Sequence, residues 1–259
     1  MTVRTELDGQ VATITIDRPD AANALDAATR RELVEAWKWV DQTADVLVAI
    51  LTGAGDRVFC AGSDLRDPAL DDFEYTADEL FGSPPRKHFH RELHTTKPVI
   101  CAINGHALGG GLELALLADI RITADHAEFG CPEVTVGSMP GAGATQRLPR
   151  LIGASAAAAM LLTGGRIGAA EALRLGLVSE SVPAAELQNR AAELAARIAR
   201  NAPLSVRATL RALRAAEELP LEQGLELERH LFGLIRSTRD RAEGRAAFRE
   251  HRDPEFGGH

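Results

Sequence analysis

A run of glycines followed by a glutamate is the first part of the sequence that could do chemistry. Gly109 to Gly111 follow the apolar run 99–103 and precede Glu113. Because glycines leave the backbone uncovered, a strand-to-helix turn here would expose amides at a positive helix end, which suits an anion or a developing oxyanion. A tight structural turn is the alternative interpretation. The run is neither a dinucleotide fingerprint nor a phosphate loop, because Leu114 stands where a further glycine is needed and no Gly-Lys-Ser/Thr follows.

Two glutamates could divide the work of a general acid and a general base. Glu113 lies three residues after Gly110, so on a helix its side chain leans back over the turn that holds this amide. Glu133 comes twenty residues later. If the chain folds back, two carboxylates and an amide could handle a proton and hold an oxyanion together. A first-turn glutamate that complements the helix dipole is the alternative for Glu113, and spacing alone leaves both open.

A complete oxyanion hole needs a second donor, and the segment Phe59 to Asp64 is the candidate. This segment follows the apolar run 46–51 and contains Ala61-Gly62-Ser63, whose small side chains allow a ligand to approach the backbone closely. Taken by itself, the segment is better interpreted as an ordinary loop in which Asp64 caps a helix.

The elements that must position these residues alternate between strand and helix. Alternation on both sides of Asp8-Gly9 predicts a hairpin, and Asp26 can cap a helix that runs to Val40. Short apolar runs predict buried strands, and the glycine-led stretch predicts a helix, over residues 46–51, 99–103, 110–118 and 120–123. This rhythm predicts an α/β fold with a largely parallel core.

The second half of the chain has the periodicity of helices from about residue 154 onward. Apolar residues share a helical face within 187–198 and again within 221–235. We expect a core over residues 1–195 that carries the site and a helical region over residues 196–259. Within the first of these regions, residues 67–79 are rich in acidic side chains. We expect this segment to form a surface excursion that serves as a lid or a pocket wall.

Composition and charge exclude several classes of function. The 259 residues hold 29 Lys and Arg against 37 Asp and Glu, and the net charge of −8 argues against broad capture of nucleic acid or an anionic membrane. The longest apolar run, 156–162, is too short to span a bilayer, and the polar N-terminus lacks a signal-peptide apolar region. We therefore expect a cytoplasmic protein without nucleic-acid or membrane partners.

Cysteine and histidine patterns give no sign of a metal centre. The three cysteines are widely spaced and form neither a disulfide framework nor a CxxC pair, as suits a reducing cytosol. His88, His90 and His94 cluster, but no further ligand is signalled, so an exposed helical face is the better interpretation. We expect no bound metal.

Linked blocks along nearly the whole chain resemble the enoyl-CoA hydratase/isomerase (crotonase) superfamily. They are Phe-x-Ala-Gly-x-Asp at 59–64, Lys-Pro-Val-Ile-x-Ala-Ile-Asn-Gly at 97–105, Ala-Leu-Gly-Gly-Gly-x-Glu-Leu-Ala at 107–115, Phe129 to Glu133, Pro140 to Leu148, Leu162 to Gly164, and Ala170 to Val178. The resemblance implies a ββα spiral core with a helical C-terminal oligomerisation region, assembled as a homotrimer or a homohexamer.

The resemblance also implies a role for each site residue. The backbone amides of Ser63 and Gly110 would form the oxyanion hole that holds the thioester oxygen of an acyl-CoA. Glu113 would orient water and accept its proton, and Glu133 would deliver the proton to Cα. Both glutamates are present, whereas isomerases of the superfamily typically keep only the one that matches Glu133.

Recognition of coenzyme A is implied for four further positions. The carbonyl near Ala61 would meet the adenine, Arg57 and Arg66 would face the phosphates, and Gly141 would contact the substrate. Two solvated arginines are the alternative interpretation of Arg57 and Arg66. The chain departs from the usual pattern by lacking a basic residue just before Asn23 and by having His251-Arg252 where relatives often have lysine. We therefore expect its contacts with the CoA phosphates to be fewer or to lie elsewhere.

The function predicted on these grounds is that of an enoyl-CoA hydratase, a lyase of fatty acid metabolism. It would add water reversibly and syn to a 2-trans-enoyl-CoA to give a 3-hydroxyacyl-CoA, with no cofactor apart from the CoA of the substrate. An enoyl-CoA isomerase, or a biosynthetic relative acting on an unusual acyl group, is the alternative. An RNA-binding protein is disfavoured, because the helix at 26–40 mixes both signs of charge, in Arg30, Arg31, Glu32, Glu35 and Lys38.

Overall fold

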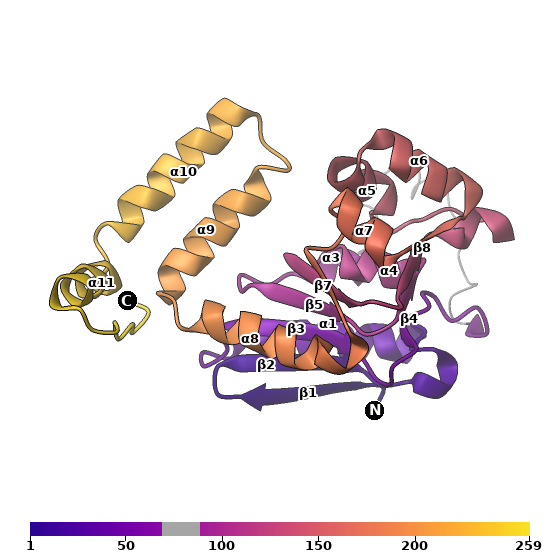
Figure 1. Ribbon diagram of the computed structural model, residues 1–259, viewed down its shortest axis with the longest axis horizontal. Helices are drawn as coiled ribbons and strands as arrows, with labels where there is room; N and C mark the ends of the chain where they lie inside the picture. The colour runs from indigo at the N-terminus through magenta and orange to yellow at the C-terminus, as the bar shows by residue number, and fades with distance from the viewer. Residues whose placement is uncertain (69–88) are drawn as a thin grey trace.

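The computed structural model describes residues 1–68 and 89–259, and the described strands form a long and a short sheet (Figure 1). The long sheet has the strand order β1 (Val3–Asp8), β2 (Val11–Ile16), β3 (Val48–Gly53), β5 (Val99–Ile103), β7 (Ile120–Ala124) and β10 (Glu180–Val182). The short sheet has the order β4 (Val58–Cys60), β6 (His106–Leu108), β8 (Glu128–Gly130) and β9 (Arg166–Gly168).

Helices connect and cover the two sheets. The α-helices are α1 (Ala27–Gln42), α3 (Phe89–Glu92), α4 (Gly110–Ala115), α5 (Ala144–Ile152), α6 (Ala154–Thr163), α7 (Ala169–Leu175), α8 (Leu187–Ala199), α9 (Pro203–Ala215), α10 (Leu221–Ile235) and α11 (Arg239–Glu250). Short 3-10 helices are η1 (Pro19–Ala21), η3 (Pro132–Val136) and η4 (Ala184–Glu186).

The chain alternates between the sheets and so winds as a spiral. Strands β3, β5 and β7 are parallel neighbours in the long sheet. Strands β4, β6 and β8, each of which follows one of them along the chain, are parallel neighbours in the short sheet. Each turn therefore adds one strand to both sheets, and α4 follows the second turn. The predicted α/β class and the ββα spiral are confirmed.

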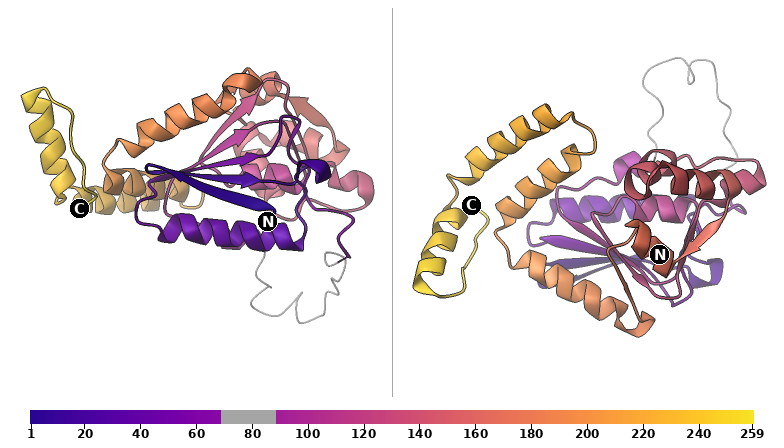
Figure 2. Two further views of the ribbon diagram at one scale, coloured as in Figure 1. Left: turned by 90° about the horizontal axis from the view of Figure 1, so that it is seen from below. Right: turned by 45° about the horizontal axis from the view of Figure 1, so that its top comes forward.

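The centre of the long sheet is buried on both faces, which explains why β3 and β5 have largely apolar runs. In β3, Val48 and Ile50 pack with the apolar face of α8, whereas Ala49 and Leu51 belong to the core that includes α1. Helices α1 and α8 accordingly lie on opposite sides of the sheet (Figures 1 and 2). The buried side chains of α1 repeat at helical spacing and are Thr29, Leu33, Val34, Ala36, Trp37 and Val40.

The first half of the chain follows the sequence prediction closely. The hairpin forms at Asp8-Gly9, with Asp8 opposite Val11, and Gly9 has a φ of +56°. Asp26 caps α1 by accepting the Thr29 amide at 2.7 Å. The predicted strand at 46–51 instead begins at Val48, and the predicted helix at 110–118 ends at Ala115.

Several short strands were not predicted, and one expectation is wrong. The expected all-helical region from residue 154 contains β9 and β10, each three residues long. Strands β4, β6 and β8 are also three residues long, too short for a period to be recognised. They form because neighbouring turns of the spiral supply their hydrogen-bonding partners. This pairing depends on the tertiary fold and leaves no local signal in the sequence.

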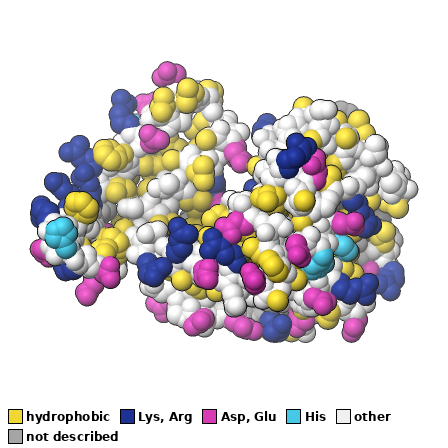
Figure 3. Space-filling model, in the orientation of Figure 1, with side chains coloured by type: hydrophobic (Ala, Val, Ile, Leu, Met, Phe, Trp, Pro, Cys, Tyr) yellow, Lys and Arg dark blue, Asp and Glu magenta, His cyan; other side chains and the backbone are white. Residues whose placement is uncertain are grey.

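Helices α9, α10 and α11 extend away from the two sheets (Figures 1 and 2). No residue of α10 is buried, and hydrophobic side chains cover α9 and α10 on the face seen in Figure 3, with basic side chains along the outer edge. Arg214 of α9 joins this region to the core through an ion pair with Asp119 at 2.8 Å. Helix α8 spans the expected boundary between residues 195 and 196, so the division into two parts stays a prediction.

Two expectations lie outside the described residues. Most of the acidic segment 67–79 and the first histidine of the cluster, His88, belong to residues 69–88.

Within 1–68 and 89–259, no helix is long and apolar enough to cross a membrane. The same two ranges contain no group of three or more His, Cys, Asp or Glu residues placed to hold a metal ion. The three cysteines are free thiols and are buried.

Candidate active site

The short sheet brings the predicted site residues to one edge. Ser63 follows β4, Gly110 follows β6 and Glu133 follows β8, and these three strands are parallel neighbours. Their carboxyl ends therefore meet at the same edge of the sheet, which is where α/β proteins commonly bind ligands. Ser63 and Glu133, seventy positions apart in the sequence, come to the same edge because the spiral repeats.

The amides of Ser63 and Gly110 lie side by side. A Cβ placed on Gly110 would be 3.7 Å from the Ser63 nitrogen and 3.5 Å from the Gly62 Cα. Ser63 forms a parallel bridge with Leu25, in which the Leu25 amide bonds to the Gly62 carbonyl and the Leu25 carbonyl accepts the Asp64 amide. In such a bridge the N–H of Ser63 itself points away from Leu25. Gly110 opens α4, so its amide has no acceptor within the helix.

The glycines of this block are required by close contacts. Gly109 has a φ of +53°, and a Cβ there would be 3.0 Å from Oε1 of Glu133. A Cβ on Gly111 would be 2.1 Å from the Cys60 carbonyl oxygen, so α4 could not approach β4 with any side chain at this position. The glycine run therefore has two roles: it allows α4 to pack closely against β4, and it leaves the backbone exposed at the site.

Glu113 lies in the first turn of α4 and is 3% exposed. Its Oε1 accepts the amide of Ala142 at 2.7 Å and the amide of Ala144 at 3.0 Å. Burial raises the pKa of Glu113, while these amides and the charge of Arg147 oppose the rise. Arg147, in α5, supports this turn, because its Nη1 donates to the Ala142 carbonyl at 3.2 Å. The carboxylate is thus fixed in one orientation.

Glu133 lies in the 3-10 helix η3 and is half-buried. Its Oε1 is the atom beside Gly109, and its Oε2 is buried without a hydrogen-bond partner. Burial is the largest cause that raises the pKa of Glu133, and the charge of Glu113 raises it further. The mutual effect means that the two carboxyl groups are electrostatic neighbours, which spacing in the sequence alone left open. A buried carboxyl oxygen without a donor favours the protonated form.

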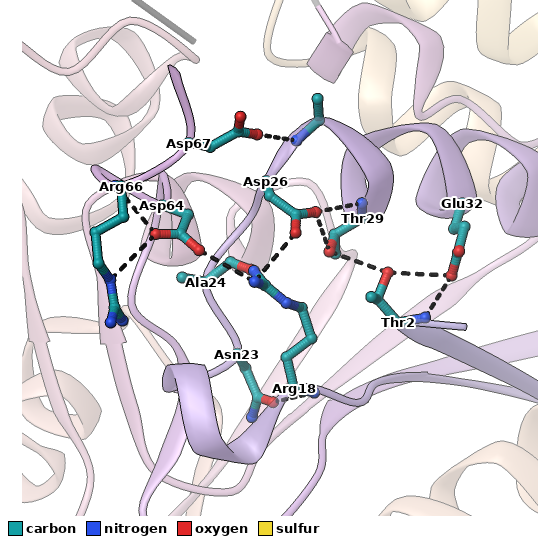
Figure 4. Close-up of polar contacts among 11 residues, drawn as sticks. Thr2, Arg18, Asn23, Ala24, Asp26, Thr29, Glu32, Asp64, Arg66 and Asp67 are labelled. Carbon is teal, nitrogen blue, oxygen red and sulfur yellow. Dashed lines mark hydrogen bonds and ion pairs between the residues drawn. The ribbon is translucent and has the colours of Figure 1, made fainter. Parts of the chain in front are cut away.

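A polar network holds the Ser63 loop against the start of α1 (Figure 4). The Arg18 guanidinium reaches Asp26 and Asp64, both at 3.1 Å. Asp26 is the cap of α1, and Asp67 accepts the Ala27 amide at 2.7 Å. The Arg66 amide and the charge of Arg18 hold the pKa of Asp64 below its usual value. This network sets the position of the loop that carries the Ser63 amide.

Sequence reasoning missed most of these supporting residues. Asn23 is 1% exposed, has a φ of +53°, and donates to the carbonyls of Ala54 and Val58 at 3.0 and 2.7 Å. Asparagine tolerates this left-handed conformation better than most residues, which is the signal that could have identified it. Arg18 and Arg147 had no comparable signal in the sequence. The partners of Arg18 lie on other segments, and the contact of Arg147 depends on the geometry of the turn 142–144.

The residues expected to bind coenzyme A are more dispersed. Ala61 follows β4 next to Ser63, and its amide donates to the Ala22 carbonyl at 3.1 Å. Arg66 lies beyond Ser63 with its side chain 83% exposed, and together with Asp64 it lines an open cavity of about 470 Å³. Gly141 is exposed. Arg57 precedes β4, so it lies at the opposite edge of the short sheet.

Comparison with known proteins agrees with the geometry. The sequence profile of the family described as "Enoyl-CoA hydratase/isomerase" matches residues 6–259. The chain is 44% identical to the (E)-benzylidenesuccinyl-CoA hydratase of Thauera aromatica, with the whole of both chains covered. It is 41% identical to the short-chain-enoyl-CoA hydratase of Clostridium acetobutylicum, over 95% of this chain and 94% of that protein.

Solved structures give the same result. An enoyl-CoA hydratase from Bacillus anthracis superposes with a TM-score of 0.90 at 37% identity, with the whole of both chains covered. The architecture is therefore the crotonase fold. The chain belongs to the enoyl-CoA hydratase/isomerase family.

Proposed function

We propose that this chain is an enoyl-CoA hydratase, a hydro-lyase that adds water reversibly and syn to a 2-trans-enoyl-CoA to give a 3-hydroxyacyl-CoA. The observation that carries the proposal is the meeting of two carboxyl groups, Glu113 and Glu133, with the Ser63 and Gly110 amides at one strand edge. Hydration needs both a proton for Cα and a base for water, so two carboxyl groups suit it.

The two amides stabilise the charge that develops on the thioester oxygen. Water addition at the β carbon pushes electrons onto this oxygen and gives an enolate-like species. Amide donors that are already in place stabilise the oxyanion without reorganisation during the reaction. The neighbouring amides of Ser63 and Gly110 support this role, because neither is taken up by the Leu25 bridge or by the helical ladder of α4.

The two glutamates divide the proton transfers. Glu113 orients the attacking water and accepts its proton, which its buried and donor-held carboxylate supports. Glu133 delivers a proton to Cα, which its raised pKa supports. A proton moves from Glu113 back to Glu133 before the next turnover, so the enzyme is restored and one water is added. The reverse sequence dehydrates the product.

Coenzyme A enters as part of the substrate, and no separate cofactor is required. The Ala61 carbonyl meets the adenine, Arg66 and Arg57 face the phosphates, and Gly141 contacts the substrate. The position of Ala61 and Arg66 on either side of Ser63 supports their part of this proposal. Arg57 would contact CoA only if the ligand reached the opposite edge of the short sheet.

The acyl group remains to be assigned by experiment, since the relatives act on different ones. Their names specify (E)-benzylidenesuccinyl-CoA, short-chain enoyl-CoA and, in Escherichia coli, 2,3-dehydroadipyl-CoA. We place this enzyme in cytoplasmic acyl-CoA metabolism, with fatty acid metabolism as one such setting. A screen of enoyl-CoAs from short to long, aromatic and acidic acyl groups assigns the preferred substrate by kcat/KM.

The C-terminal helices support assembly as a homotrimer or a homohexamer. Helix α10 carries apolar side chains that are more than half exposed, among them Leu221, Phe232 and Leu234. An apolar face of this kind is covered by another copy in an oligomer. Light scattering of the purified protein tests this, and a monomer would contradict the assembly.

The reaction itself is tested with crotonyl-CoA and with a 3-enoyl-CoA. Hydration removes the conjugated enoyl absorbance of crotonyl-CoA, whereas isomerisation of the 3-enoyl-CoA would create that absorbance. We expect turnover of crotonyl-CoA, and none in a Glu113→Gln/Glu133→Gln double variant used as the control. Isomerisation without hydration would identify the enzyme as an isomerase.

A further inference from the structure

Two arginines contact the loop that carries Ser63, and their surroundings differ. The Arg18 guanidinium is neutralised by two carboxylates, Asp26 and Asp64, each at 3.1 Å. Arg30 donates through Nη2 to the Ser63 hydroxyl at 2.8 Å, which is a neutral acceptor. One arginine thus joins the loop to its surroundings as part of an ion-pair network. The other brings a cation to the oxyanion residue itself.

The charge of Arg30 is not paired by any described carboxylate. Its Nε is buried and has no hydrogen-bond partner. Asp26 and Asp67 act on it from a distance, but their oxygens accept the Thr29 and Ala27 amides of α1. The Phe89 ring, with its centroid 5.8 Å from the guanidinium carbon, adds a weak cation–π contact.

The position of Arg30 is costly unless it serves the site. Arg30 is the fourth residue of α1, so its cation lies near the positive end of the helix dipole. Burial of part of the guanidinium adds a desolvation cost that one neutral hydroxyl does not repay. A positive charge at this place becomes favourable when negative charge develops on an oxygen held by the Ser63 amide.

We propose that Arg30 is a positioning residue of the oxyanion hole. Its hydrogen bond to the Ser63 hydroxyl fixes the serine so that its amide faces the thioester oxygen, and its charge stabilises the enolate-like oxyanion. The inference rests on the proposed hydration and on the proposed pairing of the Ser63 and Gly110 amides. It assigns to Arg30 a part in polarising the thioester carbonyl and in the transition state, and little part in the affinity for the substrate.

The test compares Arg30→Gln, Arg30→Lys, Ser63→Ala and the Arg30→Gln/Ser63→Ala double variant on crotonyl-CoA. Removing a whole oxyanion donor lowers kcat about 100- to 1000-fold, so an indirect contributor such as Arg30 should give a loss of about 10- to 100-fold in Arg30→Gln. KM should stay within about twofold of the wild-type value, because a substitution at a residue that does not contact the bound substrate changes its binding free energy by only a few tenths of a kcal/mol. Arg30→Lys should recover part of kcat, because the charge is kept.

The double variant separates action through Ser63 from a general effect of charge. Ser63→Ala keeps the amide and removes only the hydroxyl, so the combined loss should be smaller than the product of the two single losses. Lys38→Gln is the control, since it removes one positive charge from an exposed position of the same helix that does not line the cavity beside Arg66. Its kcat should equal that of the wild type.

A spectroscopic measurement gives a readout that a purely structural role would not change. A conjugated aryl enoyl-CoA absorbs at longer wavelength when its carbonyl is polarised, and Glu113→Gln should hold it without turnover. The red shift on binding should be smaller in Glu113→Gln/Arg30→Gln than in Glu113→Gln, while thermal unfolding shows that both are folded.

The outcomes distinguish this inference from the proposed reaction. Absence of crotonyl-CoA hydration by the wild type would overturn the proposed function. With wild-type hydration present, unchanged kcat and red shift in Arg30→Gln would overturn only the role of Arg30. An equal loss in Lys38→Gln, or a loss confined to KM, would overturn it as well.

Discussion

Glu113 and Glu133 present the same carboxyl group to the same edge of the short sheet, from regions that treat it differently. The region around Glu113, the first turn of α4 and the turn 142–144, surrounds one oxygen with two amide donors. The region around Glu133, the 3-10 helix η3, leaves one oxygen buried with no donor. Donors hold a carboxylate ready to take a proton, whereas their absence favours a carboxyl group that can give one.

The contrast shows that the surroundings of each carboxyl group, rather than its residue type, determine which one acts as the acid and which as the base. Burial raises the pKa of both groups. At Glu113 the amides of Ala144 and Ala142 and the charge of Arg147 oppose the rise, whereas at Glu133 only its own backbone amide opposes it. The charge of Glu113 in turn raises the pKa of Glu133. Because the two carboxyl groups interact, neither titrates independently, and the apparent pKa values are properties of the pair. The pH–rate profile should be bell-shaped, since one group must be ionised and the other protonated.

The largest effect expected is the loss of either carboxyl group. Glu113→Gln and Glu133→Gln should each lower kcat for crotonyl-CoA by about 100- to 10,000-fold, the usual contribution of general acid–base catalysis. The fold should survive, because a glutamine oxygen at position 113 can still accept the Ala142 and Ala144 amides. Steady-state kinetics with circular dichroism checks both points. Wild-type turnover in either variant would remove that glutamate from the mechanism.

A smaller loss should follow when a methyl group is placed beside Glu133. Gly109→Ala puts a Cβ 3.0 Å from Oε1 of Glu133 at a φ of +53°, so the carboxyl group must move. We expect kcat to fall about tenfold or more, since small displacements at a site are costly. Gly9→Ala is the matched control, because Gly9 has a φ of +56° and no atom within 4 Å of the added Cβ.

Equal losses of activity in the two alanine variants would contradict the contact with Glu133. Both substitutions strain the backbone at similar φ, and both should therefore lower the thermal stability. Only the variant at Gly109 should also lower kcat, and the comparison at a temperature where both are folded separates strain from the displacement of the carboxyl group.

Removal of Arg147 should shift the pH profile rather than abolish activity. The charge of Arg147 lowers the pKa of Glu113, so Arg147→Gln should raise this pKa. Hydration requires ionised Glu113 and is lost as the pH falls through its pKa, so the acid limb should move to higher pH. Arg150→Gln, about one turn further along α5, is the control, since Arg150 is exposed and donates to the Gln146 carbonyl. An unmoved acid limb in Arg147→Gln would contradict the account of Glu113.

The smallest expected effect is a gain of stability in Glu133→Gln. A carboxyl group with a raised pKa in the folded state binds its proton more tightly when folded, so this contribution to stability is present at low pH and is lost as the pH rises through the folded pKa. Glutamine removes the buried charge, so Tm should exceed that of the wild type at neutral pH. The difference should vanish below about pH 4, near the ordinary pKa of glutamate.

Sequence reasoning reached the parts of the site whose signals are local. Glu113 follows a glycine run at helical spacing, and Glu133 lies in a recognisable block, so both could be proposed without coordinates. The hairpin at Asp8-Gly9 and the buried strand at 99–103 were equally accessible, because turn chemistry and unbroken apolar runs act over a few residues.

What sequence reasoning missed depends on pairing between distant segments. Strands β4, β6 and β8 have three residues each, and they exist because successive turns of the spiral lie side by side. The contact of Arg30 with Ser63 joins positions 33 residues apart, and that of Arg18 with Asp64 joins positions 46 residues apart. No period or short motif reports such contacts, since they depend on the tertiary arrangement.

The division of labour between the glutamates is tested most directly by exchange of the Cα proton in D₂O, followed by NMR on a saturated acyl-CoA. This ligand has no double bond to hydrate, so only the proton transfer at Cα is observed. We expect Glu113→Gln to retain exchange and Glu133→Gln to lose it. Exchange that survives in Glu133→Gln, or that is lost equally in both variants, would contradict the assignment of Glu133 to Cα.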